Sequence, residues 1–188
     1  MDSGNIGFVL LCAAFVFVMT PGLAMFYGGL VRKKNVVNTM MTSIFIIGIG
    51  IVMWVLFGYS LSFAPSGNAF IGDFRWLGLE GVSLTEGYTD DASIPNMVFS
   101  AFQMMFAVIT PALITGAVAG RMKFKSIFVF TIFWSLIVYY PLAHMVWGQG
   151  GLLGADGIGA LDFAGGDVVH ISSGVSALVL CILLSLIH

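Results

Sequence analysis

Five long runs of apolar residues constrain this chain more than any other feature of its sequence. An α-helix needs ~20 apolar residues to cross a hydrocarbon core about 30 Å thick. Each run is that long, and it must be helical in lipid because its backbone polar groups find no water there. The runs cover residues 6–31, 38–63, 94–119, 126–147 and 166–188. We therefore predict an all-α integral membrane protein in which residues 1–188 form a single transmembrane domain, a bundle of five helices.

The composition excludes a soluble domain. Hydrophobic residues make up 59% of the chain and charged residues 9%, whereas soluble domains carry roughly 25% charged residues. The two cysteines, Cys12 and Cys181, are far apart in apolar runs and form neither a metal-ligand pattern nor a disulfide framework. The sequence also contains no nucleophile paired with a base and no phosphate-binding loop. We therefore expect no enzyme activity, no metal and no cofactor.

The basic residues predict the orientation of the helices. Six of the seven fall in two short loops, after the first run and after the third, which an alternating topology places on one side of the membrane. These residues are Arg32, Lys33, Lys34, Arg121, Lys123 and Lys125. Loops rich in Lys and Arg face the cytoplasm. We therefore expect a multi-pass protein of the cell membrane with its N-terminus outside.

The loop over residues 64–93 is then external. It contains five acidic side chains: Asp73, Glu80, Glu86, Asp90 and Asp91. An acidic rim raises the local concentration of cations, but acidic side chains also keep a loop soluble. The sequence leaves both interpretations open.

Aromatic side chains are expected to gather in the outer half of the bundle. Phe102 and Phe106 are four residues apart, so they share one face of the third helix. Trp147 ends the fourth helix on the same outer side, and Asp162 precedes the fifth. Aromatic faces attract a small cation by ~0.5–2 kcal/mol. The pattern thus favours a cation-binding vestibule, although each aromatic ring alone is as well explained by packing or by an interfacial belt.

His170 is the polar side chain that we expect deepest in the membrane. At 1.5 Å per residue it lies about 12 Å below Asp162, near the bilayer centre, where an ionisable group is a functional candidate. The alternative is a histidine bonded to a neighbouring helix. We interpret Asp162 first as a cap for backbone N–H groups. We expect His144 near the outer interface and assign it no role.

Four segments carry a resemblance to a known family. They are residues 20–35 (TPGLAMFYGGLVRKKN), 102–116 (FQMMFAVITPALITG), 144–148 (HMVWG) and 161–170 (LDFAGGDVVH). With these motifs in this order, the chain resembles the Amt/MEP/Rh family of ammonium transporters, in its microbial Amt branch. The resemblance covers the whole chain and implies the first of two inverted five-helix repeats.

The resemblance implies roles for individual residues. Phe106 and Trp147 match the cation–π contacts of an outer ammonium vestibule, and Phe102 and Phe106 match a stacked pair that closes the pore below it. Asp162 matches a structural acid. The backbone at Ala164 and Gly165 matches the vestibule floor, and His170 matches the first of two pore-lining histidines.

The resemblance also implies a mechanism and partners. Ammonium would be deprotonated, ammonia would pass a hydrophobic pore, and the histidines would relay the proton. The family's assembly is a homotrimer with one pore per subunit, and a cytoplasmic PII signal protein is a candidate partner. The competing functions are an ammonium sensor and a regulatory membrane module that lacks a complete pore.

The chain departs from the family pattern at three points. Gly120 precedes Arg121 where a glutamate is usual, and Asp167 stands where serine or threonine is common. The third point is length, since family members have about eleven spans. One hypothesis is that the chain is a fragment of such a transporter. The other is that two copies pair antiparallel around two His170 residues, which the one-sided distribution of basic residues opposes.

Overall fold

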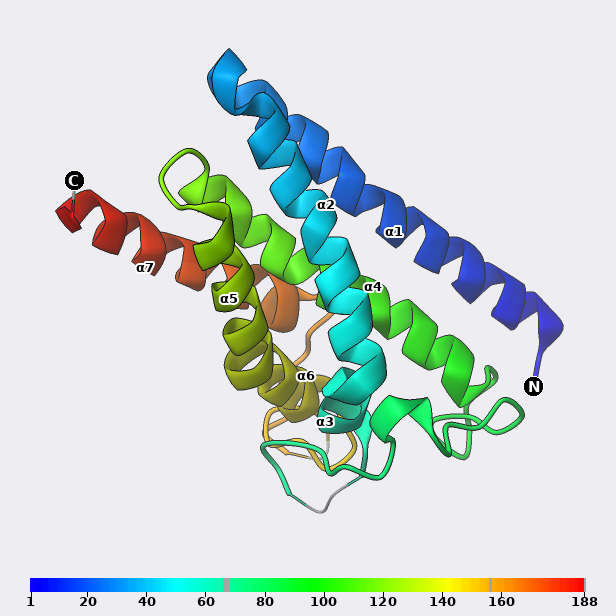
Figure 1. The fold of residues 1–188 in the computed structure, drawn as a ribbon. Coiled ribbons are helices and arrows are strands. Elements are labelled where there is room, and N and C mark those ends of the chain that lie inside the picture. The colour runs from blue at the N-terminus through cyan, green and yellow to red at the C-terminus, as the bar shows by residue number, and fades with distance from the viewer. Residues whose placement is uncertain (66–67, 156, 188) are drawn as a thin grey trace.

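The computed structural model describes residues 1–65, 68–155 and 157–187 and contains helices and no strand within them. The α-helices are α1 (Ser3–Leu30), α2 (Val36–Met53), α3 (Tyr59–Phe63), α4 (Asn96–Val118), α5 (Phe124–Trp134), α6 (Tyr140–Trp147) and α7 (Ser172–Ile187). Three π-helical segments, η2 (Trp54–Gly58), η4 (Ser135–Tyr139) and η5 (Gly166–Ile171), join α2 to α3, join α5 to α6 and precede α7. Short 3-10 turns lie at η1 (Lys33–Asn35) and η3 (Leu77–Leu79). Figure 1 shows the arrangement.

These segments make five helices that are long and apolar enough to span a membrane. They cover Ser3–Leu30, Lys33–Phe63, Asn96–Val118, Phe124–Trp147 and Gly166–Leu186. The predicted fold class, an all-α bundle of five membrane-spanning helices, is therefore confirmed. Three residues of the expected spans and loops, Ser66, Gly67 and His188, lie outside the described residues.

Helix α4 is the centre of the bundle and α1 lies at its edge. Helices α1, α2 and α7 all pack against α4, and α1 also packs along α2 (Figure 1). Half of the most apolar part of α4 (50%) is buried, against 11% in α1. The exposed side chains of α1 are mostly large and apolar, as lipid contact requires.

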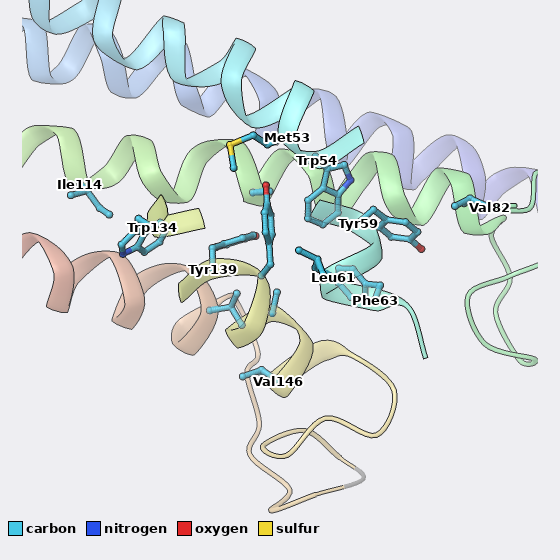
Figure 2. Packing of buried hydrophobic residues seen from close by; sticks show 14 residues of the cluster. Met53, Trp54, Tyr59, Leu61, Phe63, Val82, Ile114, Trp134, Tyr139 and Val146 are labelled. Atoms are coloured by element: carbon cyan, nitrogen blue, oxygen red, sulfur yellow. The ribbon is translucent and has the colours of Figure 1, made fainter. Parts of the chain in front are cut away.

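An aromatic cluster forms the core where α3 packs against α6. Trp54, Tyr59, Phe63 and Tyr140 are each at most 1% exposed and pack ring against ring. Figure 2 shows Trp54, Tyr59 and Phe63 among the buried side chains. Gly58 allows this contact, because a Cβ atom there would lie 2.7 Å from Cζ of Tyr140. The cluster holds the two helix ends together at a fixed spacing, since such closely packed rings leave little room to shift.

Polar contacts bind the cluster and the N-terminus to α4. Trp54 Nε1 donates to the Ser100 carbonyl at 3.2 Å, and the Tyr59 hydroxyl donates to Asn96 Oδ1. Near the start of α1, Asn5 Nδ2 donates to Ser93 Oγ at 2.9 Å, just before α4 begins. These bonds bring the starts of α1 and α4 to the same end of the molecule as η2 and α3.

The loops gather by charge at opposite ends of the bundle. The acidic loop over residues 68–93 meets the loop after α6, where the Leu152 N–H donates to the Ala69 carbonyl at 3.0 Å. The two basic loops meet at the other end and line one hollow there. The separation of charge that underlies the topology prediction is thus present, while the cytoplasmic side itself stays a prediction.

Candidate functional site

Three aromatic rings from two helices form one contact chain. Phe102 and Phe106 of α4 meet edge to face, with ring centroids 5.0 Å apart at an interplanar angle of 86°. Phe106 then meets Trp147 at the end of α6, at 6.1 Å and 64°. All three side chains are half-buried. Phe102 and Phe106 meet because they are four residues apart on α4, and the end of α6 brings Trp147 to them. The three aromatic residues selected from the sequence therefore lie together.

Asp162 organises the start of the fifth long helix. Its Oδ2 accepts a hydrogen bond from the Val168 N–H at 3.2 Å, so its carboxylate caps η5 as the sequence interpretation expected. Gly165 has φ 73°, a conformation that side chains disfavour, and its carbonyl accepts from the N–H groups of Val169 and His170, both at 3.0 Å. The bond to His170 spans five residues, so it sets a π-helical turn.

The second oxygen of Asp162 stays unpaired within the described residues. Oδ1 is buried and finds no hydrogen-bond partner there. An unpaired buried carboxylate oxygen costs free energy unless a donor or a cation reaches it. Asp162 therefore caps the helix with one oxygen and leaves a centre of negative potential with the other.

His170 lies on a face that this chain does not cover. Its side chain is exposed, as are Gly166 and Gly174 on either side of it along the helix. The described part of the chain provides no hydrogen bond to its imidazole. The small neighbours thus make no helix contact within the chain, and the alternative of a histidine bonded to a neighbouring helix of this chain is not realised.

The segment before η5 is equally open. Leu161 and Phe163 are 95% and 102% exposed, and Ala164 is exposed while Gly165 is buried. Large apolar side chains rarely stand free in this way unless another surface covers them. The exposed residues around η5 therefore include Leu161, Phe163 and His170.

His144, to which sequence reasoning assigned no role, is fully buried in α6. Its Nδ1 lies 3.1 Å from the Ser62 carbonyl oxygen, and its Nε2 lies 2.8 Å from the Asn68 carbonyl oxygen. The imidazole thus ties α6 to the end of α3 and to the acidic loop that follows it, one turn before Trp147. The sequence places His144 one turn before Trp147, which could have drawn attention to it. Its contact with the loop at Asn68 could not be predicted from the sequence.

The described residues give no indication of a metal site. No group of three or more His, Cys, Asp or Glu side chains comes together in them. Asp167 is half-buried in the first turn of η5, and Gly120 is exposed with φ 73°. Asp167 forms no ion pair within this part of the chain. Glycine has no charge, so Gly120 offers Arg121 no ion-pair partner at the position where a glutamate is usual in the family.

The fold and the side chains described above define a multi-pass helical membrane protein with an aromatic contact chain, a capping aspartate and an exposed histidine. Comparison with known proteins identifies the family of this chain. The profile of the Ammonium Transporter Family matches residues 7–185. The chain belongs to this family.

Ammonium transporters of other organisms have similar sequences. The chain is 53% identical to an ammonium transporter of Bacillus subtilis over 184 residues, which is 98% of this chain and 44% of that protein. An ammonium transporter of Aquifex aeolicus is 44% identical over 95% of this chain and 41% of its own length. The chain thus spans less than half the length of the curated relatives it matches.

Solved structures share the fold. The crystal structure of Candida albicans Mep2 aligns with a TM-score of 0.83 and 33% identity, covering 95% of this chain and 38% of that one. A structure described as a sensor Amt protein aligns with a TM-score of 0.80 and 27% identity, covering 96% of this chain and 44% of that one.

Proposed function

We propose that this chain supplies one half of an ammonium-conducting pore. The observation that carries the proposal is the contact chain of Phe102, Phe106 and Trp147, together with the exposed His170 on η5. Aromatic faces attract a small cation, and a histidine can carry a proton. The names of the similar proteins support ammonium as the cation.

The first step is recruitment of the ammonium ion at the outer site. Phe106 and Trp147 present ring surfaces to the ion, and each ring contributes ~0.5–2 kcal/mol. The unpaired Oδ1 of Asp162 adds negative potential from below. The backbone carbonyl of Ala164 lies where the chain turns into η5 and is the candidate to accept a hydrogen bond from the ion, because the Gly165 carbonyl already accepts from two backbone N–H groups.

The second step is selection by loss of the charge. The pair Phe102 and Phe106 acts as the pore gate, and an apolar constriction imposes a large desolvation cost on any ion while a neutral molecule passes at little cost. Ammonium gives up a proton and crosses as ammonia. Potassium has no proton to give up and is excluded.

The third step is the relay of the released proton along the pore through His170. An imidazole titrates near neutral pH and both accepts and donates a proton. Its exposure leaves room for a second titratable group from whatever covers this face. A longer chain with an inverted second repeat is the first candidate for that cover, and a second copy of this chain in antiparallel arrangement is the other.

Assembly and location belong to the same proposal. A homotrimer in the cell membrane, with the N-terminus outside and a cytoplasmic PII signal protein as partner, suits the apolar outer surface of α1 and the basic end of the bundle. Each of these points can be tested apart from conduction.

A sensing role is the alternative function. The structural similarity to a sensor Amt protein favours it, because the same outer site would serve to detect ammonium. A regulatory membrane module without a complete pore belongs to this alternative as well. Both predict ammonium binding without current.

The test uses the protein expressed from its complete coding sequence and reconstituted in liposomes. We expect an ammonium-evoked current and no potassium current. Asp162→Ala removes the cap of η5 and displaces the site, and a displacement of about 1 Å costs roughly a hundredfold in rate. Asp167→Ala, one turn further along, is the matched control and should keep most of the current. Absence of ammonium current in the native protein would contradict conduction, and native current in Asp162→Ala would remove Asp162 from the site.

A further inference from the structure

A tyrosine of the acidic loop binds the segment that follows α6, two residues beyond Trp147. The backbone N–H of Gln149 donates to Tyr88 Oη at 3.0 Å, and Gln149 Nε2 donates to the Tyr88 carbonyl at 2.8 Å. Both residues are half-buried, and they lie 61 positions apart in the sequence. Two hydrogen bonds between one pair of residues fix the orientation of the two segments as well as their distance.

The ring of Tyr88 is itself held on two sides. It stacks on Phe99 of α4, with ring centroids 4.8 Å apart at an interplanar angle of 7°, and it meets Phe63 of α3 edge to face at 5.5 Å and 89°. Stacked and edge-to-face pairs are both favourable arrangements of aromatic rings. Just before Tyr88, the Glu86 carbonyl accepts from the Asn96 N–H at the start of α4, at 2.7 Å. The Tyr88 hydroxyl therefore has a fixed position relative to α4.

The backbone between Trp147 and Gln149 has little freedom to shift. The one residue between them is Gly148, which is buried, and a Cβ atom there would lie 2.7 Å from Nδ1 of His144. The Gly148 N–H also donates to the His144 carbonyl at 2.9 Å. Backbone that is packed this closely transmits a displacement rather than absorbing it. A displacement of Gln149 therefore moves Trp147 as well.

These contacts form a closed circuit between α4 and the end of α6. Phe99 and Phe106 are seven residues apart, so they lie on one face of α4, two turns from each other. Phe99 contacts Tyr88, and Tyr88 accepts both hydrogen bonds from Gln149. Trp147 then returns to α4 through its contact with Phe106. The acidic loop thus ties the end of α6 to the helix that carries the ring facing Trp147.

We infer that Tyr88 and Gln149 are positioning residues that hold Trp147 against Phe106 for the binding of ammonium. The inference rests on the proposed role of Trp147 in recruiting the ion. An aromatic ring attracts a cation that lies over its face within about 6 Å of its centroid, so a small displacement of the indole weakens the attraction. The alternative is that the two hydrogen bonds only stabilise the acidic loop, and they would then have no effect on ammonium affinity.

The test measures current against ammonium concentration for the protein expressed from its complete coding sequence, in liposomes. Tyr88→Phe keeps the ring and removes the acceptor of the Gln149 N–H, and Gln149→Leu removes the donor to the Tyr88 carbonyl. We expect each variant to raise the half-saturating ammonium concentration about threefold, and the double variant to raise it about tenfold. The maximal current should stay within about twofold of native, because loss of a binding contact alone raises the half-saturating concentration without slowing the later steps.

Tyr59→Phe is the matched control for the loss of a hydroxyl group. It removes another tyrosine hydrogen bond at the same end of the bundle, but that bond goes to Asn96 and not to Gln149. We expect this variant to keep the native half-saturating concentration. A native value in the double variant, or an equal rise in Tyr59→Phe, would overturn the inference.

A spectroscopic measurement separates this inference from conduction. The protein is labelled with fluorotryptophan, and Trp147→Phe assigns the fluorine resonance of Trp147. In detergent without ammonium, the double variant should shift or broaden that resonance, and Tyr59→Phe should leave it unchanged. An unchanged Trp147 resonance in the double variant would contradict the positioning role. If the native protein conducts no ammonium, the proposed function fails, while the fluorine spectrum still decides whether Tyr88 and Gln149 position Trp147.

Discussion

The two described histidines of this chain occupy opposite environments. His144 is fully buried, and both of its ring nitrogens face backbone carbonyl oxygens at 3.1 and 2.8 Å. His170 is exposed, and the described residues offer its imidazole no hydrogen bond. One residue type therefore ties two segments together in one region and is an exposed side chain without a hydrogen bond from the described residues in the other.

The difference teaches how to separate a structural histidine from a functional one. A neutral imidazole has one N–H donor, so His144 donates to one of the two carbonyls while its other nitrogen lies beside the second. Both nitrogens are enclosed by backbone and leave no place for a ligand. A histidine without a partner at membrane depth costs free energy that folding alone does not justify. The uncovered face around His170, rather than the tightly packed end of α6, is thus the region where we expect chemistry.

The largest expected effect is on stability at His144. His144→Ala removes the imidazole contacts to the Ser62 and Asn68 carbonyls and opens a cavity, which should cost about 2–4 kcal/mol of unfolding free energy. Thermal unfolding in detergent, followed by tryptophan fluorescence, measures the loss. His170→Ala is the comparison and should cost no more than about 0.5 kcal/mol, as at other exposed sites.

His144→Gln refines this experiment. The amide N–H group can donate to one of the two carbonyls, so the glutamine variant should recover part of the stability that alanine loses. Equal destabilisation by His144→Ala and His170→Ala would show that the two environments do not differ as described.

A second prediction concerns ion selection at His170. His170→Glu should keep ammonium conduction in the full protein and admit potassium. A carboxylate 4 Å from a cation contributes ~4 kcal/mol at an effective dielectric constant of 20, more than the ~1.4 kcal/mol that corresponds to a factor of ten. We therefore expect potassium current at least tenfold above the native level in liposome recordings.

The neutral substitution His170→Gln isolates the charge. It should leave potassium excluded, because an amide cannot replace the missing hydration of the ion to the same extent. If His170→Glu still rejects potassium, His170 has no part in selectivity. The interpretation of His170 as the functional histidine would then be wrong.

The sequence predicted most of the fold because lipid allows few alternatives. The length of the apolar runs determines the five helices, and a spacing of four determines that Phe102 and Phe106 meet. The cap at Asp162 also follows from local sequence, since an acid just before a helix has few other roles.

The remaining features depend on segments far apart in the chain. The partners of His144 lie 82 and 76 residues away, one at the end of α3 and the other on the loop that follows, whose path no periodicity describes. The π-helical start of α7 requires the left-handed Gly165 and its close contact with Val169, which composition does not reveal. The exposure of His170 depends on which surface covers it, and local pattern carries no such information.

The smallest expected effect lies in the external loop and concerns Asp73 and Arg75. Arg75 Nη2 lies 2.7 Å from Asp73 Oδ2, and both side chains are partly exposed. The hydrogen bond from the Arg75 side chain lowers the pKa of Asp73, and partial burial opposes this shift. A lowered pKa stabilises the fold above the ordinary aspartate value near 3.9. This contribution is lost as the pH falls through the lowered pKa.

Arg75→Gln should therefore raise the pKa of Asp73 toward its ordinary value and leave stability at neutral pH almost unchanged, because exposed ion pairs contribute little. Titration of the carboxyl carbon by NMR measures the shift, and Asp90→Asn in the same loop is the control that should not alter it. An unchanged pKa in Arg75→Gln would mean that the backbone N–H of Arg75, 3.0 Å from Asp73 Oδ1, holds the carboxylate by itself. The acidic loop would then owe its shape at this point to a backbone N–H group, and its charges would be free to act on cations.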